Sequence, residues 1–208
     1  MKSFSKAISQ LLSSPQLYLL HTRILGGRIT KKIIFREHLR SEPGLRVLDV
    51  GCGPATDRDL LGNVKWTGLD FEPRYVKYAR KRLQRGDQIL LGDVEAISEV
   101  LDDQFDLVLL AGVLHHLDDV QVNQALNDSA KLLSSNGRIM TIDPVRTASA
   151  GRIEVFLLNA DRGKYIRSSV QYNSLTPNSL ITVSETVHDR LSWIPQATRV
   201  SFLKKPTR

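Results

Sequence analysis

A glycine-rich segment, Val47 to Asp57 (VLDVGCGPATD), most constrains what this chain can fold into. Its first four residues, Val47 to Val50, are mostly apolar and predict a buried strand. Gly51 and Gly53 then allow a tight turn and a close approach of the backbone to a ligand. Proline suits the first position of a helix, so we predict a short helix over Pro54 to Leu61. Free N–H groups and the dipole at such a helix start favour an anionic or polar ligand above the strand end.

A carboxylate at the end of the next predicted strand indicates a nucleotide-type ligand. Val64 to Leu69 is the predicted strand, and Asp70 ends it, about twenty residues after the glycine turn, as a nucleotide-binding βαβ unit requires. A carboxylate in this place accepts hydrogen bonds from both ribose hydroxyls more strongly than a neutral side chain would. Asp70 is therefore the predicted ribose ligand.

The glycine segment itself distinguishes between two classes of nucleotide cofactor. A dinucleotide site has the pattern Gly-x-Gly-x-x-Gly, but the third position here is Thr56. Asp49 also places a carboxylate beside the loop, and its charge would repel a pyrophosphate. The same charge suits a ligand that carries an ammonium and a sulfonium. The combination favours S-adenosylmethionine over a nicotinamide dinucleotide.

Five sequence blocks in order, spread between Leu45 and Pro144, resemble those of the class I S-adenosylmethionine-dependent methyltransferases, of the broad bacterial type that acts on small molecules. They are VLDVGCGPA, TGLDFEPRYVKYAR, LLGDVEAI, FDLVLLAGVLHHLDD and LLSSNGRIMTIDP. The chain departs from the family pattern at Ala55, where a third loop glycine is often found, and at 135–137, where Ser-Asn-Gly replaces the usual Pro-Gly-Gly.

The resemblance implies an α/β fold, a Rossmann-like seven-stranded sheet that is mostly parallel with one antiparallel strand and has helices on both faces. It also implies one domain over residues 1–208: an N-terminal helical lid at 1–44, a cofactor-binding core at 45–144, and a substrate-side segment with the last two strands at 145–208. The cofactor-binding residues expected from the motifs are Asp49, Gly51, Cys52, Gly53, Asp70, Phe71, Asp93, Val94 and Ala111.

By the same resemblance, Asp93 accepts a hydrogen bond from the adenine amine and Val94 offers its backbone N–H to a ring nitrogen. Asp93 can equally cap a short helix predicted over Glu95 to Leu101. Cys52 is the sole cysteine, so it has no partner for a disulfide within the chain, and its expected role is packing.

Length and composition are consistent with one globular domain. The chain has 208 residues, 41% of them hydrophobic, which suits a single sizeable core. No apolar run approaches the roughly 20 residues that cross a bilayer, and the N-terminus lacks the continuous apolar region and cleavage site of a signal peptide. We therefore expect a cytoplasmic enzyme.

The net charge of +7 lies entirely within the first 46 residues, which hold nine Lys or Arg against two Glu. This segment predicts three helices, Phe4 to Leu12, Leu17 to Leu25 and Ile29 to Leu39. They can form a lid over the cofactor, or simply pack on the sheet edge. They can also contact a membrane surface with Lys31, Lys32 and Arg36 toward lipid headgroups. A solvated helix face, or a surface for an anionic substrate or nucleic acid, would account for the charge as well.

The apolar strand Phe105 to Leu110 ends at Ala111-Gly112, where small residues let cofactor and acceptor lie close together. Methyltransferases that act on base amines commonly carry Asn or Asp, two prolines and an aromatic residue there, and this chain does not. It also lacks the acidic ligand of a catechol-type metal site. Adjacent His115 and His116 cannot readily share one ion in a rigid turn. The sequence therefore predicts no metal and argues against nucleic-acid amines as acceptors.

Three histidines are candidate general bases, since imidazole accepts a proton near neutral pH: His115, His116 and His188. The first two can instead be a packing element at the cofactor edge, and His188 a hydrogen-bonded strand end. Downstream, a polar stretch can place Asp161, Arg162, Tyr165 or Arg167 at the pocket mouth, or form an ordinary polar turn after a helix.

The remaining predicted elements are a helix over Pro73 to Arg85, a strand over Gln88 to Leu91, a helix over Val120 to Leu133 capped by Asp118-Asp119, a strand over Arg138 to Ile142, a helix over Arg152 to Leu158, and strands over Ser179 to His188 and Thr198 to Lys204. Together with the motifs, they predict methyl transfer to an O, N or C atom of a small molecule. Three alternatives stay open: a nicotinamide dehydrogenase, which the glycine loop disfavours, a catalytically silent cofactor-binding subunit, and an RNA methyltransferase. The acceptor and the oligomeric state are left open.

Overall fold

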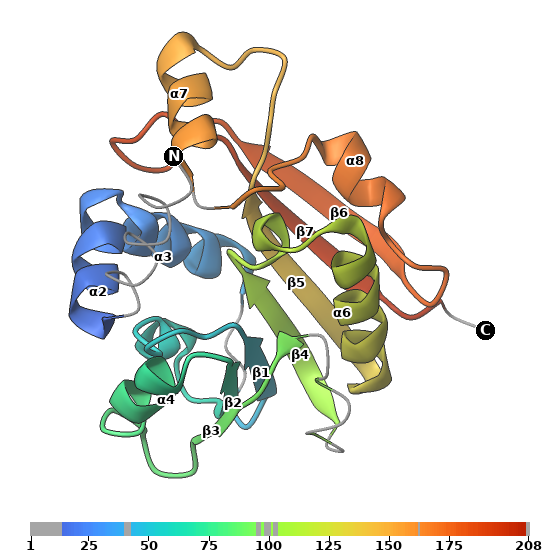
Figure 1. Cartoon of the computed structure of the whole chain (residues 1–208). Helices are drawn as coiled ribbons and strands as arrows, with labels where there is room; N and C mark the ends of the chain where they lie inside the picture. The colour runs from blue at the N-terminus through green and yellow to red at the C-terminus, as the bar shows by residue number, and fades with distance from the viewer. Residues whose placement is uncertain are drawn as a thin grey trace.

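The computed structural model describes residues 14–39, 43–94, 97, 101, 104–161 and 163–206. These residues form one seven-stranded sheet with the strand order β3-β2-β1-β4-β5-β7-β6 (Figure 1). Neighbouring strands pair in parallel from β3 to β5, and β7 pairs antiparallel with both β5 and β6. The predicted fold class is confirmed. The strands are β1 Arg46–Val50, β2 Lys65–Asp70, β3 Gln88–Leu91, β4 Phe105–Ala111, β5 Leu133–Pro144, β6 Ile181–His188 and β7 Thr198–Lys204.

Helices cover both faces of the sheet. They are α2 Pro15–Ile24, α3 Gly27–His38, α4 Pro73–Ala79, α6 Asp119–Lys131, α7 Arg152–Ala160 and α8 Ser169–Ser174, with short 3-10 turns η1 Arg58–Leu61 and η3 Leu114–His116. None of the helices in the described part of the chain has the length and apolar character needed to span a membrane.

Alternation along the strands builds two separate cores. Val47 and Leu107 face the side on which Ile34 and Phe35 of α3 are buried. Leu48 and Val108 face the other side and pack in one cluster with residues of α6, namely Val122, Ala125 and Leu126. Successive residues of a strand point to opposite faces, so a strand buried on both faces is apolar throughout.

Helix ends agree with the chemistry of their residues. Pro15 is the first residue of α2, and Gly26, at a φ of 66°, breaks the chain between α2 and α3. Asp118 caps α6 in a reciprocal capping box with Gln121, which satisfies two backbone N–H groups at the helix start.

The helix predicted from Pro54 to Leu61 is wrong. Ala55 has a φ of 54°, and a left-handed residue cannot continue a right-handed helix. The chain instead turns and forms only η1 over Arg58–Leu61. The expected ligand site at a helix start is therefore not formed, and the glycine loop must hold a ligand with its own backbone and side chains.

Other differences are smaller. The helix predicted to Arg85 ends at Ala79, and α8 was not predicted. The strand predicted over Arg138 to Ile142 spans Leu133–Pro144, so the Ser-Asn-Gly segment at 135–137 lies within β5. The helix expected over Phe4 to Leu12 lies outside the described residues, as does most of the one expected over Glu95 to Leu101.

Candidate active site

The glycine loop follows β1 and is held against the end of β2. The backbone N–H groups of Gly51 and Cys52 both donate to the carbonyl oxygen of Leu69, at 2.8 and 3.1 Å. Gly51 has a φ of 67°, and a Cβ atom there would lie 2.8 Å from a methyl carbon of Val113. Glycine is required at this position for both reasons. Burial raises the pKa of the Cys52 thiol, which keeps it neutral and suits the packing role predicted for it.

Asp70 ends β2 with its carboxylate turned onto the loop. It is only 5% exposed, and it accepts backbone hydrogen bonds from Gly53 at 2.7 Å and Glu72 at 2.9 Å. Burial raises the pKa of this carboxyl group, although the two backbone donors oppose the rise. Each carboxylate oxygen has two lone pairs, so both retain acceptor capacity for a ligand hydroxyl.

The residues predicted to surround the nucleoside are placed around Asp70. Phe71 is 70% exposed, and Asp93 is exposed just beyond β3. Val94 is half-buried and packs against the core on the α6 side. The structure thus groups these residues at the carboxyl ends of β2 and β3, the edge at which ligands bind in open α/β sheets.

Asp49 lies one strand away, buried beneath the glycine loop. Its carboxylate accepts a hydrogen bond from the Trp66 indole at 3.3 Å. Burial raises the pKa of Asp49 to about 7, with the ammonium of Lys31 acting to lower it. A buried carboxylate near its pKa at neutral pH gains most from a cationic ligand, because the ligand stabilises its charged form.

An ion pair that sequence reasoning missed joins α3 to the glycine loop. Lys31 Nζ lies 2.7 Å from Asp57 Oδ2, with both side chains largely buried. Burial is the largest single effect and acts against the charge of Lys31. The charges of Asp57, Tyr18 and Asp49 and the hydrogen bond to Asp57 together outweigh it and raise the pKa of the amine. The alternative in which Lys31 faces lipid headgroups gains no support here, since its ammonium is paired with Asp57. The pairing joins residues 26 positions apart, so no local pattern could have shown it.

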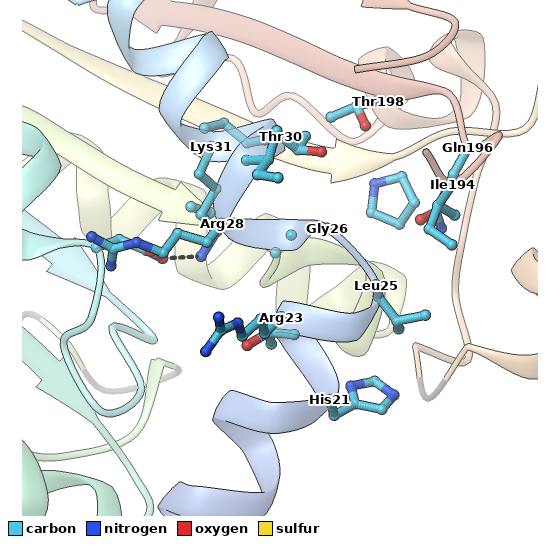
Figure 2. Close-up of a pocket in the computed structure, with 18 of the residues that line it drawn as sticks. His21, Arg23, Leu25, Gly26, Arg28, Thr30, Lys31, Ile194, Gln196 and Thr198 are labelled. Atoms are coloured by element: carbon cyan, nitrogen blue, oxygen red, sulfur yellow. Dashed lines mark hydrogen bonds and ion pairs between the residues drawn. The ribbon is translucent and has the colours of Figure 1, made fainter. Parts of the chain in front are cut away.

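A cavity of about 1050 Å³ lies beside this loop, between the N-terminal helices and the sheet edge. Figure 2 shows the α2–α3 turn, with Leu25 and Gly26, beside Ile194, Gln196 and Thr198. Ala111 is the predicted cofactor residue that lines the cavity. Thr56 and Asp57, at the end of the glycine loop, also line it. Tyr18 of α2 lies above the loop, 3.8 Å from where a Cβ of Gly53 would be. α2 and α3 therefore line one side of the cavity, and their action as a lid stays a prediction.

His115 is the best-held titratable side chain of the cavity. Its Nδ1 lies 2.8 Å from Asp143 Oδ1, and its backbone N–H donates to the same oxygen at 3.2 Å. Its Nε2 lies 3.7 Å from Asp161 Oδ1. Gly163 packs so closely that a Cβ there would overlap the imidazole ring. The ring is thus fixed in orientation by a buried carboxylate at the end of β5.

The other two predicted bases differ in position. His116 also lines the cavity, with its ring centroid 4.1 Å from that of His115. His188 is not among the residues that line the cavity. Its Nε2 lies 3.2 Å from Nε2 of His38 instead. The prediction that His188 acts as a base stays a prediction that this position does not support.

Residues of the polar stretch after α7 lie in two different environments, some in the cavity wall and others in buried contacts away from it. Asp161 lines the cavity as predicted, whereas Arg162 lies outside the described residues. Arg167 is not at the pocket mouth: it is buried and donates to Asp119 Oδ1 and to the carbonyl oxygens of Leu114 and Leu117. It braces the turn that carries the two histidines, because a guanidinium can satisfy several acceptors at once.

The site suits a cofactor that has a ribose and a positive charge. Asp70 retains acceptor capacity beside the loop, and Asp49 is a buried carboxylate within reach of the same loop. Side chains larger than hydrogen cannot stand at Gly51 without displacing Val113. These residues fit S-adenosylmethionine, for which the sequence predicted them.

Comparison with known proteins agrees with this reading. Residues 48–141 match the family described as a methyltransferase domain. The ubiquinone biosynthesis O-methyltransferase of Xylella fastidiosa is 31% identical over 118 residues, which are 54% of this chain and 47% of that protein. The chain spans about half, or less, of the length of the curated relatives it matches.

Solved structures share the fold. The mitomycin 7-O-methyltransferase superposes with a TM-score of 0.73 at 20% identity, covering 95% of this chain and 60% of that one. The N-methyltransferase NodS of Bradyrhizobium japonicum, in complex with S-adenosyl-L-homocysteine, gives 0.65 at 19% identity and 87% coverage of each chain. Residues 48–141 thus match the family described as a methyltransferase domain, and the solved structures share the fold of this chain.

Proposed function

We propose that the protein transfers a methyl group from S-adenosylmethionine to an O, N or C atom of a small molecule. The observation that carries the proposal is the His115–Asp143 pair, 2.8 Å apart, on the wall of a cavity that adjoins the glycine loop of a methyltransferase domain. The volume of about 1050 Å³ is slightly above the usual range for ligand sites and leaves room for an acceptor beside Ala111.

The cofactor would supply an activated methyl group on its sulfonium. The chain's task is then to hold donor and acceptor in line, an effect that contributes roughly 7 to 11 kcal/mol in well-oriented systems. Asp70 and Phe71 would hold the ribose side, Asp93 and Val94 the adenine, and Asp49 the cationic end. Gly51, Cys52 and Gly53 would present backbone to the cofactor, and Ala111 would leave space for the acceptor.

His115 would take the proton that a hydroxyl acceptor loses when its oxygen gains the methyl group. An Nδ1–H donated to Asp143 leaves the Nε2 lone pair as the proton acceptor. The buried Asp143 carboxylate would stabilise the imidazolium that forms. Asp161, 3.7 Å from Nε2, would stabilise the same charge.

The cavity lining supports an acceptor with an apolar body and an acidic group. Apolar side chains come from the N-terminal helices, α7 and the segment before β7: Leu19, Leu25, Ile29, Leu157 and Ile194. Cationic ones come from the two N-terminal helices and from the turn after α4: Arg23, Lys32 and Arg82. We propose that this cationic side binds a carboxylate or phosphate of the acceptor.

Peripheral membrane contact through α2 and α3 is also proposed. Leu20 and Ile24 on α2 are 55% and 60% exposed, and Ile29 and Ile33 on α3 are 42% and 37% exposed, among basic residues of the same helices. Apolar side chains beside Arg and Lys suit the interface of an anionic bilayer. Sedimentation with vesicles that contain anionic lipid should recover the protein, and Ile24→Glu should weaken this; equal recovery with neutral vesicles would contradict the charge-dependent contact.

Calorimetric titration with S-adenosylmethionine and S-adenosyl-L-homocysteine tests the cofactor site. We expect Asp70→Ala to weaken both by at least about 100-fold, since it removes charge-assisted hydrogen bonds to the ribose. Asp106→Ala is the matched control, because Asp106 lies at the start of β4 and pairs with Arg46 on the surface. Wild-type protein that binds neither ligand would favour the silent interaction subunit instead.

Transfer of labelled methyl groups to a panel of acceptors tests the reaction. Small phenols, quinols and amines with and without an acidic group should separate reactive from inert classes, and acidic members should react at the lower KM. Labelling of RNA in preference to every small acceptor would reverse the proposal and support the RNA methyltransferase alternative.

A further inference from the structure

A cluster of three metal-ligating side chains lies outside the cavity, where α3 meets the end of β6. It consists of Glu37, His38 and His188, and one ligand atom from each residue lies within 4.8 Å of the other two. His38 is the last residue of α3, and His188 is the last residue of β6. The sequence predicted no metal, on the evidence of His115–His116 and of the end of β4. The Glu37–His38–His188 cluster lies at neither place.

The two imidazoles have the spacing of ligands on one ion. Their Nε2 atoms lie 3.2 Å apart, and the rings meet edge-on with an interplanar angle of 77°. Two nitrogens that each lie about 2.0 to 2.1 Å from a tetrahedral zinc ion are about 3.3 Å apart. A single N–H···N hydrogen bond also fits this distance, whereas an ion between the rings would use the lone pairs of both.

Regular structure holds both histidines in place without the ion. Ile34 and Phe35, one turn before His38, are 0% and 3% exposed, so the end of α3 is anchored in the core. The His38 ring also lies 6.2 Å from that of Phe202. His188 pairs with Thr198 of β7. Ligands on anchored helix and strand ends make a preorganised site.

From this geometry we infer that Glu37, His38 and His188 bind a divalent transition-metal ion. Two neutral imidazoles and one carboxylate are ligands that zinc and its neighbours in the first row accept. Glu37 is exposed, which leaves the ion open to water as a fourth ligand. The ion would be structural in effect, since it would tie α3 to the sheet, and α3 carries Gly27 to Lys32 along the cavity wall.

Zinc titration of the untagged full chain, stripped with chelator and then freed of it, tests the inference directly. We expect one zinc ion per chain, a higher thermal midpoint with zinc, and visible absorption of bound Co²⁺ typical of tetrahedral nitrogen and oxygen ligands. Even changes to residues behind the ligands cost about 10- to 100-fold in affinity. Loss of a ligand in His38→Ala or His188→Ala should therefore weaken zinc binding by at least about 100-fold, and Glu37→Gln by less.

His21→Ala is the matched control, because it removes a histidine from the opposite end of the same helical pair and should leave zinc affinity unchanged. Circular dichroism shows whether each variant folds. If an alanine variant does not fold, zinc binding is measured instead with His188→Gln, which changes a residue on the edge strand. No zinc binding by the wild type, or equal weakening by His21→Ala, would overturn the inference. So would full affinity in both His38→Ala and His188→Gln. None of these readouts depends on methyl transfer.

Discussion

At the scale of single residues, the charge on the buried Asp49 carboxylate has opposite effects on folding and on the binding of a cationic cofactor. Burial raises the pKa of its carboxyl group from 3.8 to about 7, despite the opposing charge of Lys31. Between these values the folded protein holds a proton that the unfolded chain has lost. The free energy of unfolding therefore falls as pH rises from 3.8 to about 7 and levels off above that. A cationic ligand offsets this cost by stabilising the ionised carboxylate.

Asp49→Asn should remove that part of the pH dependence. Relative to wild type, the ligand-free variant should gain stability between about pH 5 and pH 8, by roughly 2 to 4 kcal/mol, while its affinity for S-adenosylmethionine falls. Urea unfolding at both pH values and calorimetry measure the two effects. Parallel pH dependence in variant and wild type would show that Asp49 is already ionised.

His115 and Asp143 test the proton transfer. His115→Ala should lower kcat for a hydroxyl acceptor at least about 100-fold and leave the Kd of the cofactor near that of wild type. Asp143→Asn should act in the same direction with a smaller loss, because Oδ1 still orients the ring. His116→Ala and His188→Ala in the same assay compare the other two predicted bases. Wild-type turnover in His115→Ala would end its assignment.

At the scale of elements, Arg167 holds the turn η3 onto the start of α6. Its guanidinium is 6% exposed and pairs with Asp119 at 2.6 Å, besides donating to two carbonyl oxygens of the turn. Arg167→Leu removes the guanidinium donors from these acceptors and should cost about 2 kcal/mol in the free energy of unfolding. It should also lower kcat, since η3 carries His115.

Arg152→Leu is the control for that change. Arg152 is exposed at the first position of α7, and surface substitutions of this kind usually change stability by less than about 0.5 kcal/mol. Chemical denaturation of both variants decides the matter. Equal effects would mean that the buried guanidinium contributes no more than a surface one.

At the scale of the whole molecule, the Lys31–Asp57 pair connects the N-terminal helices to the cofactor-binding core. The two side chains are 24% and 20% exposed, so solvent screens the pair only in part. A double-mutant cycle with Lys31→Met and Asp57→Asn should give a coupling energy of about 1 to 2 kcal/mol in urea unfolding. Lys32 is an exposed neighbour, so Lys32→Met should show no coupling energy with Asp57→Asn. A coupling energy as large as that of Lys31→Met would indicate a general electrostatic effect rather than a specific ion pair.

Most of the fold could be predicted because its signals are local. Apolar runs predicted the seven strands, and Asp118 predicted the cap of α6, since period and capping depend on neighbouring residues. The failures have local causes that the sequence does not show. Ala55 adopts a left-handed conformation that its side chain does not favour, so the helix expected after the glycine loop is lost.

The sequence by itself predicted a methyltransferase domain, its cofactor and the groups expected around it, because those residues lie in contiguous motifs at strand ends. Only the tertiary structure decided which side chains meet across distance. It paired His115 with Asp143 and Lys31 with Asp57. It also buried Arg167 against the carbonyl oxygen of Leu114 and brought His188 within hydrogen-bond distance of His38. The physical reason is that such contacts depend on how strands and helices pack, and residues 26 to 150 positions apart leave no shared pattern in the chain.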